Sequence, residues 1–121
     1  MNLFSVQVST CPKLTMFENS GKVYSPAFPQ VIRVNAKCEY LLVGHTGTSI
    51  NVCFPHLDMN WASTVSLYDG LTASTPFSTL SANPAQMPCL NSSQNIVKMI
   101  FSSSSAANGR GWEADFLEFT H

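Results

Sequence analysis

Charge is scarce in this sequence, and the few charged residues do not gather. Only 11% of the 121 residues are Asp, Glu, Lys or Arg, and the formal net charge is −1. A nucleic-acid-binding surface needs a clustered basic face, and a membrane-binding segment needs a run of Lys and Arg. The six basic residues are scattered along the chain, so neither nucleic acid nor a membrane surface is expected as a partner.

Long apolar runs are also lacking. No stretch approaches the roughly 20 consecutive apolar residues of a membrane-spanning helix, so membrane insertion is not expected. The composition is nevertheless 45% hydrophobic, which is too apolar for a disordered chain. A length of 121 residues favours one folded domain.

Helical periodicity is absent, because no long window has apolar residues at i, i+3, i+4 and i+7. Short runs in which apolar and polar residues alternate indicate strands with one face in a core. Turn-forming pairs such as Asp69-Gly70 and Asn108-Gly109 separate these runs. The pattern predicts an all-β sandwich or barrel. The apolar positions of the runs are Phe4, Val6 and Val8; Cys38, Tyr40 and Leu42; Ile50, Val52 and Phe54; Val65 and Leu67; Val97, Met99 and Phe101; and Trp112, Ala114 and Phe116.

Catalytic motifs are missing. No serine lies in a Gly-x-Ser-x-Gly turn, and His45, His56 and His121 lie in three different segments. The carboxylates follow no pattern of a paired-carboxylate hydrolase. The chain is therefore predicted not to be an enzyme, and the alternative is a Ser-His-Asp set that the fold assembles from distant residues.

Closely spaced cysteines are absent too. Zinc sites typically use pairs such as Cys-x-x-Cys, whereas Cys11, Cys38, Cys53 and Cys89 are at least fifteen positions apart. An even number in a short chain predicts two disulfides, with three possible connectivities, and an extracellular location. The sequon that begins at Asn91 predicts an N-linked glycan, which suits this location.

Six segments resemble, in order, the motifs of the CUB domain family. The resemblance runs from Cys11 to about Phe119 and implies an antiparallel jelly-roll-like β-sandwich. Residues 11–121 would then form a single CUB-like domain, and residues 1–10 an N-terminal extension or an added strand. The segments are Cys11 with Gly21-Lys22-Val23-Tyr24-Ser25-Pro26-Ala27-Phe28-Pro29; Cys38-Glu39-Tyr40-Leu41-Leu42; Ile50, Val52 and Phe54; Val65-Ser66-Leu67-Tyr68-Asp69-Gly70; Ser92-Ser93-Gln94-Asn95 with Val97, Met99 and Phe101; and Gly111-Trp112-Glu113-Ala114-Asp115-Phe116.

The resemblance implies that Cys11 pairs with Cys38 and Cys53 with Cys89. The second pair departs from the family pattern, because Cys53 lies several residues earlier than the family's third cysteine. Cys53 also faces away from its apolar neighbours Val52 and Phe54, since neighbouring residues of a strand alternate faces. The alternatives for this pair are two free thiols or a bond to another chain.

Calcium is a second departure. Many CUB domains bind Ca²⁺ through three acidic residues, and the matching positions are about Asn60, Ser63 and Ser103. None of these is charged, and Asp58 is a single nearby carboxylate. Calcium takes roughly six to eight oxygen ligands, usually including several carboxylates. No metal and no other cofactor is therefore expected.

The segment from Pro55 to Thr64 is the candidate binding loop. Its candidate residues are His56, Asp58, Met59, Asn60 and Trp61. Tryptophan is enriched in binding hot spots, and the alternative is that Trp61 covers the edge of the core. Trp112, in the closing motif, is expected to lie in the core.

The outward positions of the last two strands form a candidate interface. An exposed apolar patch of this kind often marks an association surface. Lys98 is expected to pair with Glu113 or Asp115 across the strands. The alternative is that residues 1–10 cover the patch as an added strand. The candidate interface residues are Ile96, Ile100, Leu117 and Phe119.

The resemblance implies a secreted, non-catalytic module that binds extracellular proteins. A lectin-like protein that binds a glycan is the first alternative, because sugar sites combine an exposed aromatic face with polar side chains. The residues that would supply such a site are His56, Asp58, Asn60 and Trp61. The second alternative is a homo-oligomer that assembles into an extracellular structure through the apolar patch.

Overall fold

The computed structural model describes residues 13–26, 28–29, 35–81, 87–104 and 109–120. This part of the chain contains strands and no helix, so it holds no helix suited to crossing a membrane. Its strands are β1 (Thr15–Glu18), β2 (Ser20–Tyr24), β3 (Ala36–Val43), β4 (Thr48–Asp58), β5 (Ser63–Asp69), β6 (Ser78–Ser81), β7 (Cys89–Asn91), β8 (Ile96–Ser103) and β9 (Gly111–Thr120).

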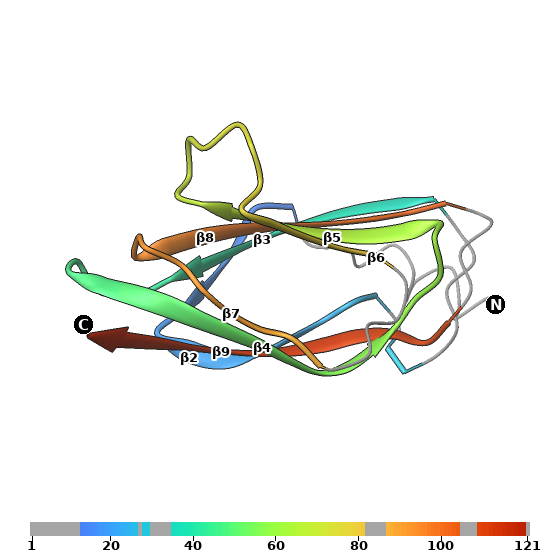
Figure 1. The fold of residues 1–121 in the computed structure, drawn as a ribbon, viewed down its shortest axis with the longest axis horizontal. Coiled ribbons are helices and arrows are strands. Elements are labelled where there is room, and N and C mark those ends of the chain that lie inside the picture. The colour runs from blue at the N-terminus through green and yellow to red at the C-terminus, as the bar shows by residue number, and fades with distance from the viewer. Residues whose placement is uncertain (1–12, 27, 30–34, 82–86, 105–108, 121) are drawn as a thin grey trace, which may run out of the picture.

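The strands form two sheets that face each other as the two layers of a sandwich (Figure 1). Sheet A has the order β1-β3-β8-β5-β6, and sheet B has the order β2-β9-β4-β7. All neighbours are antiparallel except β1 and β3, which run parallel. The sandwich predicted from the alternating runs is therefore confirmed. The connection between β5 and β6 projects beyond sheet A (Figure 1).

The core lies between the sheets, and Trp112 of β9 is at its centre. The Trp112 side chain is fully buried, and its indole ring makes edge contacts with Tyr40, Phe54 and Phe101 at centroid distances of 5.2, 5.9 and 5.8 Å. Such aromatic pairs contribute about 0.5–1.5 kcal/mol each beyond the burial of their area. The expected core position of Trp112 is confirmed.

Two sequence motifs meet where β2 ends and β9 begins. The Ser25 hydroxyl accepts a hydrogen bond from the Trp112 backbone N–H at 2.9 Å, and the Ser25 backbone N–H donates to the Trp112 carbonyl at 3.0 Å. Gly111 has a φ of 94°, and a Cβ at this position would collide with the Ser25 hydroxyl. With Ser25 in this place, position 111 has room only for a glycine.

A second pair of motifs meets at the other end of the sandwich. The Asp69 carboxylate accepts hydrogen bonds from the Ser93 hydroxyl at 2.6 Å, the Ser93 N–H at 2.9 Å and the Gln94 N–H at 2.9 Å. Partial burial by itself would raise the pKa of Asp69, but these hydrogen bonds outweigh it and hold the pKa below its ordinary value. The carboxylate therefore ties the end of β5 to the turn before β8.

The disulfide predicted for the second cysteine pair is confirmed. Cys53 and Cys89 are register partners on β4 and β7, with Cα atoms 4.0 Å apart, and their sulfurs are bonded. The alternatives of free thiols and of a bond to another chain are therefore wrong. Cys38 is buried and disulfide-bonded. Its expected partner Cys11 lies outside the described residues, as does the expected added strand within residues 1–10.

The predicted apolar patch does not exist as one surface. Strand β8 belongs to sheet A and β9 to sheet B, so their outward faces lie on opposite sides of the sandwich. Ile96 and Ile100 point outward from sheet A, whereas Leu117 and Phe119 lie on the outer face of sheet B. The prediction was wrong because strand alternation identifies the inward face but not the sheet to which a strand belongs.

The predicted ion pair of Lys98 is wrong for the same reason. The Lys98 ammonium lies 4.9 Å from the centre of the Tyr68 ring, on sheet A. On sheet B, Glu113 and Asp115 pair with Lys22 of β2 instead.

The Ser25 contact generates a prediction about stability. Ser25→Ala leaves the buried Trp112 N–H without its acceptor, which we expect to lower the free energy of unfolding by about 1–3 kcal/mol. Chemical denaturation measures the change. Ser66→Ala, at a half-buried position on β5, is the control and should change stability by less than about 0.5 kcal/mol. Equal effects of the two substitutions would contradict this account of Ser25.

The Asp69 contacts generate a prediction about pH. Because the folded-state pKa lies below that of the unfolded chain (about 3.9), the stabilisation is present above pH 4 and is lost as the pH falls through the folded-state value. Asp69→Asn should therefore lower the free energy of unfolding by about 1 kcal/mol at pH 7. The difference from the wild type should shrink below pH 4.

Urea unfolding at a series of pH values measures this difference. Glu18→Gln, an exposed substitution on β1, serves as the control and should have little effect at any pH. If Asp69→Asn lowers the free energy of unfolding by the same amount at every pH from 7 to 3, the carboxylate does not have this role.

Candidate functional site

A bulge in β4 shapes the outer face of sheet B. Cys53 is the register partner of Asp115 on β9, but His56 is the partner of Glu113, so β4 has one extra residue between Cys53 and His56. Pro55 lies in this stretch. Proline lacks the N–H that a regular ladder needs and is therefore tolerated at a bulge. The bulge places His56 beside Glu113 on the outward face.

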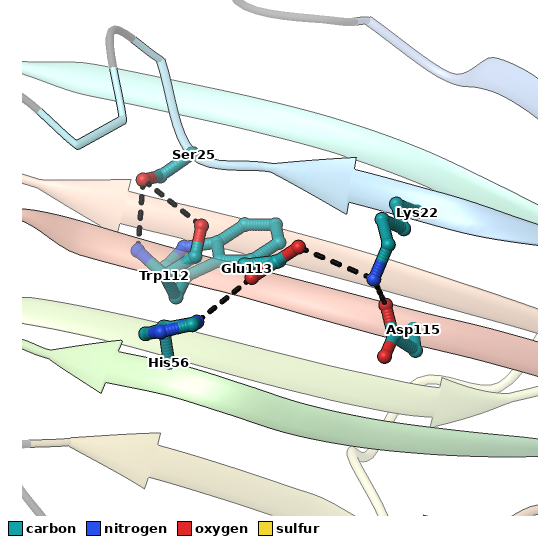
Figure 2. Close-up of polar contacts among 6 residues, drawn as sticks. All are labelled: Lys22, Ser25, His56, Trp112, Glu113 and Asp115. Carbon is teal, nitrogen blue, oxygen red and sulfur yellow. Dashed lines mark hydrogen bonds and ion pairs between the residues drawn. The ribbon is translucent and has the colours of Figure 1, made fainter.

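Three strands contribute side chains to one row across this face. Tyr24 of β2 and His56 of β4 are the register partners of Glu113 on either side of β9. Glu113 lies 2.8 Å from the His56 Nδ1 atom and 3.3 Å from the Lys22 ammonium (Figure 2). The Lys22 ammonium is also 2.6 Å from the Asp115 carboxylate. The Glu113 carboxylate is thus held between two side chains.

Lys22 responds to its two acidic neighbours. The hydrogen bond with Asp115, helped by Glu113, raises the pKa of Lys22 above its ordinary value. Lys22 therefore stays charged at neutral pH and balances the carboxylates of β9.

Aromatic rings line the edge of the same row. The Phe28 ring stacks on the Tyr24 ring at 5.9 Å and is tilted against the His56 ring at 6.0 Å. Tyr24 is 45% exposed although its backbone carbonyl accepts a hydrogen bond from the buried Tyr40 hydroxyl at 2.6 Å. These rings give the outer face an apolar rim beside charged groups.

A pocket of about 570 Å³ opens next to these rings. It lies at the end of sheet B where β4 ends and β9 begins, away from Thr120. Segments far apart in the sequence build its walls. The lining residues are Phe28, Pro29, Pro55, His56, Leu57, Asp58, Met87 and Arg110.

The charged side of the pocket is fixed by backbone contacts. The Asp58 carboxylate accepts a hydrogen bond from the Arg110 N–H at 3.1 Å. Gly109 has a φ of 118°, and a side chain there would collide with the Asp58 backbone. Gly109 and Arg110, just before β9, therefore lie in close contact with the end of β4.

The candidate binding loop is shorter than expected. Strand β4 continues to Asp58 and β5 begins at Ser63, so the segment from Pro55 to Asp58 is strand rather than loop. His56 and Asp58 line the pocket as outward residues of β4. The continuation of β4 to Asp58 was not predicted, because the bulge at Pro55 interrupts the alternation of apolar and polar residues.

The two large residues of the candidate loop behave differently. Met59 is 4% exposed and packs in the core, so its expected place in a binding surface is wrong. Trp61 is 76% exposed, so the alternative that it covers the edge of the core is wrong. The Asn60 side chain accepts a hydrogen bond from the Ala62 N–H at 3.1 Å, which holds the turn and leaves Trp61 at its tip.

Sequence reasoning missed several pocket residues. Phe28 belongs to a family motif in which it was interpreted as a determinant of the fold, and Met87 and Arg110 belong to no motif. The available signal was an apolar or charged side chain next to proline or glycine. Pro29 follows Phe28, Pro88 follows Met87, and Arg110 lies between two glycines. The three pocket residues reach His56 because the segments after β2, before β7 and before β9 meet at the end of β4.

The three positions matching the family's calcium ligands do come together. Ser63 and Ser103 are register partners on β5 and β8, and the Ser63 N–H donates to the Asn60 carbonyl at 3.1 Å. None supplies a carboxylate, and no group of three or more His, Cys, Asp or Glu residues that suits a metal occurs in the described ranges. These residues do not fit a calcium ion.

The fold has counterparts among known proteins. The CUB domain family model matches residues 11–116. The full extracellular region of zebrafish Gpr126/Adgrg6 is similar, with a TM-score of 0.78 and 15% identity over 92% of this chain. The CUB1-EGF-CUB2 domain of human MASP-1/3 has a TM-score of 0.74 and 19% identity over 90% of this chain. The MASP-1 CUB2 domain bound to Ca²⁺ has a TM-score of 0.72 and 16% identity.

The lengths covered differ between these structures. This chain spans 15% of the zebrafish extracellular region and 42% of the human fragment. The match to the MASP-1 CUB2 domain covers 99% of that domain and 88% of this chain. At these identities the likeness establishes the fold alone.

The disulfide generates a prediction about the pocket wall. Strand β7 has only three residues and follows Met87 and Pro88, and the Phe54 N–H donates to the Pro88 carbonyl at 3.0 Å. Replacing Cys53 and Cys89 together with serine should lower the free energy of unfolding by about 3–4 kcal/mol, because the bond closes a loop with a sequence separation of 36.

Amide hydrogen exchange locates the effect of that double substitution. We expect faster exchange at Phe54, whose hydrogen bond holds the segment before β7, while Trp112 stays protected. Unchanged exchange at Phe54 would mean that the disulfide does not hold this wall of the pocket.

Proposed function

Because the chain belongs to the CUB domain family, whose members are non-catalytic modules of extracellular protein interaction, we propose that it is a secreted module that binds an extracellular protein at the pocket. The pocket itself carries this proposal. Phe28, Pro55 and Met87 converge there from three separate segments and present apolar surface at a concave site. Covering apolar surface favours association, and hot spots concentrate in such pockets.

Other features support an extracellular location. The chain has disulfides, which persist in oxidising compartments. Asn91, the first residue of the sequon, is exposed on β7, an edge strand of sheet B. A glycan there would stand at the free edge of β7 and hinder pairing with another chain.

Trp61 extends the proposed surface. Its side chain is on the turn that follows Asp58, at the same end of the sandwich as the pocket. An exposed tryptophan beside a pocket is a frequent anchor in protein interfaces. A partner that fills the pocket and reaches past Asp58 would cover Trp61 as well.

A lectin-like function is the second candidate. The exposed Tyr24 ring stacks on the Phe28 ring, which lies beside His56 in the pocket that Asp58 also lines, and sugars bind where aromatic faces adjoin polar groups. Self-assembly has less support, because the four residues expected to form one apolar interface are divided between opposite faces.

Binding to purified extracellular proteins tests the proposal. We expect the wild-type chain to bind at least one secreted or cell-surface ectodomain in a panel, measured by biolayer interferometry. Phe28→Ala should weaken this binding at least about tenfold, since truncation of a hot-spot aromatic costs about 2 kcal/mol. Phe77→Ala is the matched control, because Phe77 is an exposed phenylalanine just before β6, on the other sheet.

Two outcomes would contradict the proposed function. If Phe77→Ala weakens binding as much as Phe28→Ala, the pocket is not the site. If no ectodomain binds and a glycan array gives a signal that Phe28→Ala abolishes, the lectin-like alternative replaces the proposal.

A further inference from the structure

Some charged side chains around the pocket form ion pairs and others do not. Glu113 is held by Lys22 and His56, and Lys22 also pairs with Asp115. In contrast, the Arg110 guanidinium makes no hydrogen bond or ion pair within the described part of the chain, where only its backbone N–H is engaged. Among the described residues that line the pocket, Arg110 therefore supplies a cation whose charged group its described neighbours do not engage.

The backbone around Arg110 is held in place before any ligand arrives. The Arg110 N–H bonds to Asp58, and the flanking Gly109 and Gly111 are both at positive φ in close contact with Asp58 and Ser25. A pre-organised site loses less conformational entropy on binding. A guanidinium is also a planar fork that matches a carboxylate with two parallel hydrogen bonds.

The remaining walls favour an apolar group next to that carboxylate. Phe28, Pro29, Pro55 and Met87 line the pocket without a polar side-chain group. One of the two ring nitrogens of His56, Nδ1, is already engaged by Glu113. A sugar needs partners for several hydroxyls, whereas an aliphatic or aromatic side chain needs none. A peptide segment therefore suits these walls better than a glycan.

We propose that the pocket receives an acidic segment of the partner protein, with an Asp or Glu carboxylate on the Arg110 guanidinium and a neighbouring apolar side chain between Phe28, Pro55 and Met87. This inference rests on the proposed function and names the chemistry of its partner. Asp58 opposes the incoming carboxylate, so the apolar contact supplies most of the affinity and the charge supplies selectivity.

Short peptides test the inference on the intact chain. The probes are acetyl-Gly-Asp-Phe-Gly-amide and its analogues with Asn or Lys in place of Asp, and with Ala in place of Phe. Chemical-shift titration of the labelled protein at low ionic strength reports binding at Phe28, Met87 and Arg110. We expect the Asp peptide to bind about threefold to tenfold more tightly than the Asn peptide, with the Lys peptide weakest. The Ala analogue should bind more weakly than its Phe parent.

Variants of the two charged residues should shift this preference in opposite directions. Arg110→Ala should reduce the Asp/Asn preference to about one, and Arg110→Glu should favour the Lys peptide. Asp58→Asn keeps a hydrogen-bond acceptor for the Arg110 N–H and should increase the preference for the Asp peptide. Lys37→Ala, on β3 of the other sheet, is the control and should leave the preference unchanged.

Several results would overturn the inference. Equal binding of the Asp and Asn peptides to the wild type would do so, and so would a preference that survives Arg110→Ala. Tighter, Arg110-dependent binding of the methyl glycoside of N-acetylneuraminic acid would replace the peptide with an acidic sugar. If Phe28→Ala abolishes binding of an ectodomain while Arg110→Glu leaves it intact, the proposed function stands and this inference fails.

Discussion

The register of β9 determines both the core and the outer face, and Trp112 fixes that register. Its indole ring contacts three aromatic rings, while its backbone N–H donates to the Ser25 hydroxyl and its carbonyl accepts from the Ser25 N–H. A slip of one residue would turn Trp112 to solvent and bury Glu113. Because Trp112 points inward, Glu113 points outward between His56 and Lys22. The charged row therefore depends on the packing of the core.

At both ends of the sandwich, side-chain hydrogen bonds join neighbouring segments of the chain. Ser25 with Gly111 closes one end of the sandwich, and Asp69 with Ser93 closes the other. Each contact joins residues that are distant in the sequence, so each one fixes a connection between strands that local preference does not specify. The pocket lies beside the first of these closures, where Gly109 and Gly111 hold Arg110 in place.

Alternation and motif order predicted the sandwich, the core position of Trp112 and the pairing of Cys53 with Cys89. They failed on Ile100 and Leu117, because a period of two does not reveal which sheet a strand joins. They also failed on Met59, which lies between two strands but turns into the core. The pocket was only partly predicted: His56 and Asp58 were expected, but the bulge at Pro55 and the arrival of Phe28 and Arg110 depend on cross-strand register.

In the proposed function, a partner protein binds at the pocket end of sheet B. Hydrogen–deuterium exchange of the chain, with and without a bound ectodomain, tests it most directly. Slower exchange on binding at His56, Asp58 and Arg110, with β5 and β6 unchanged, is the result that this account predicts. Slower exchange confined to β5, β6 and the projecting connection between them would contradict it.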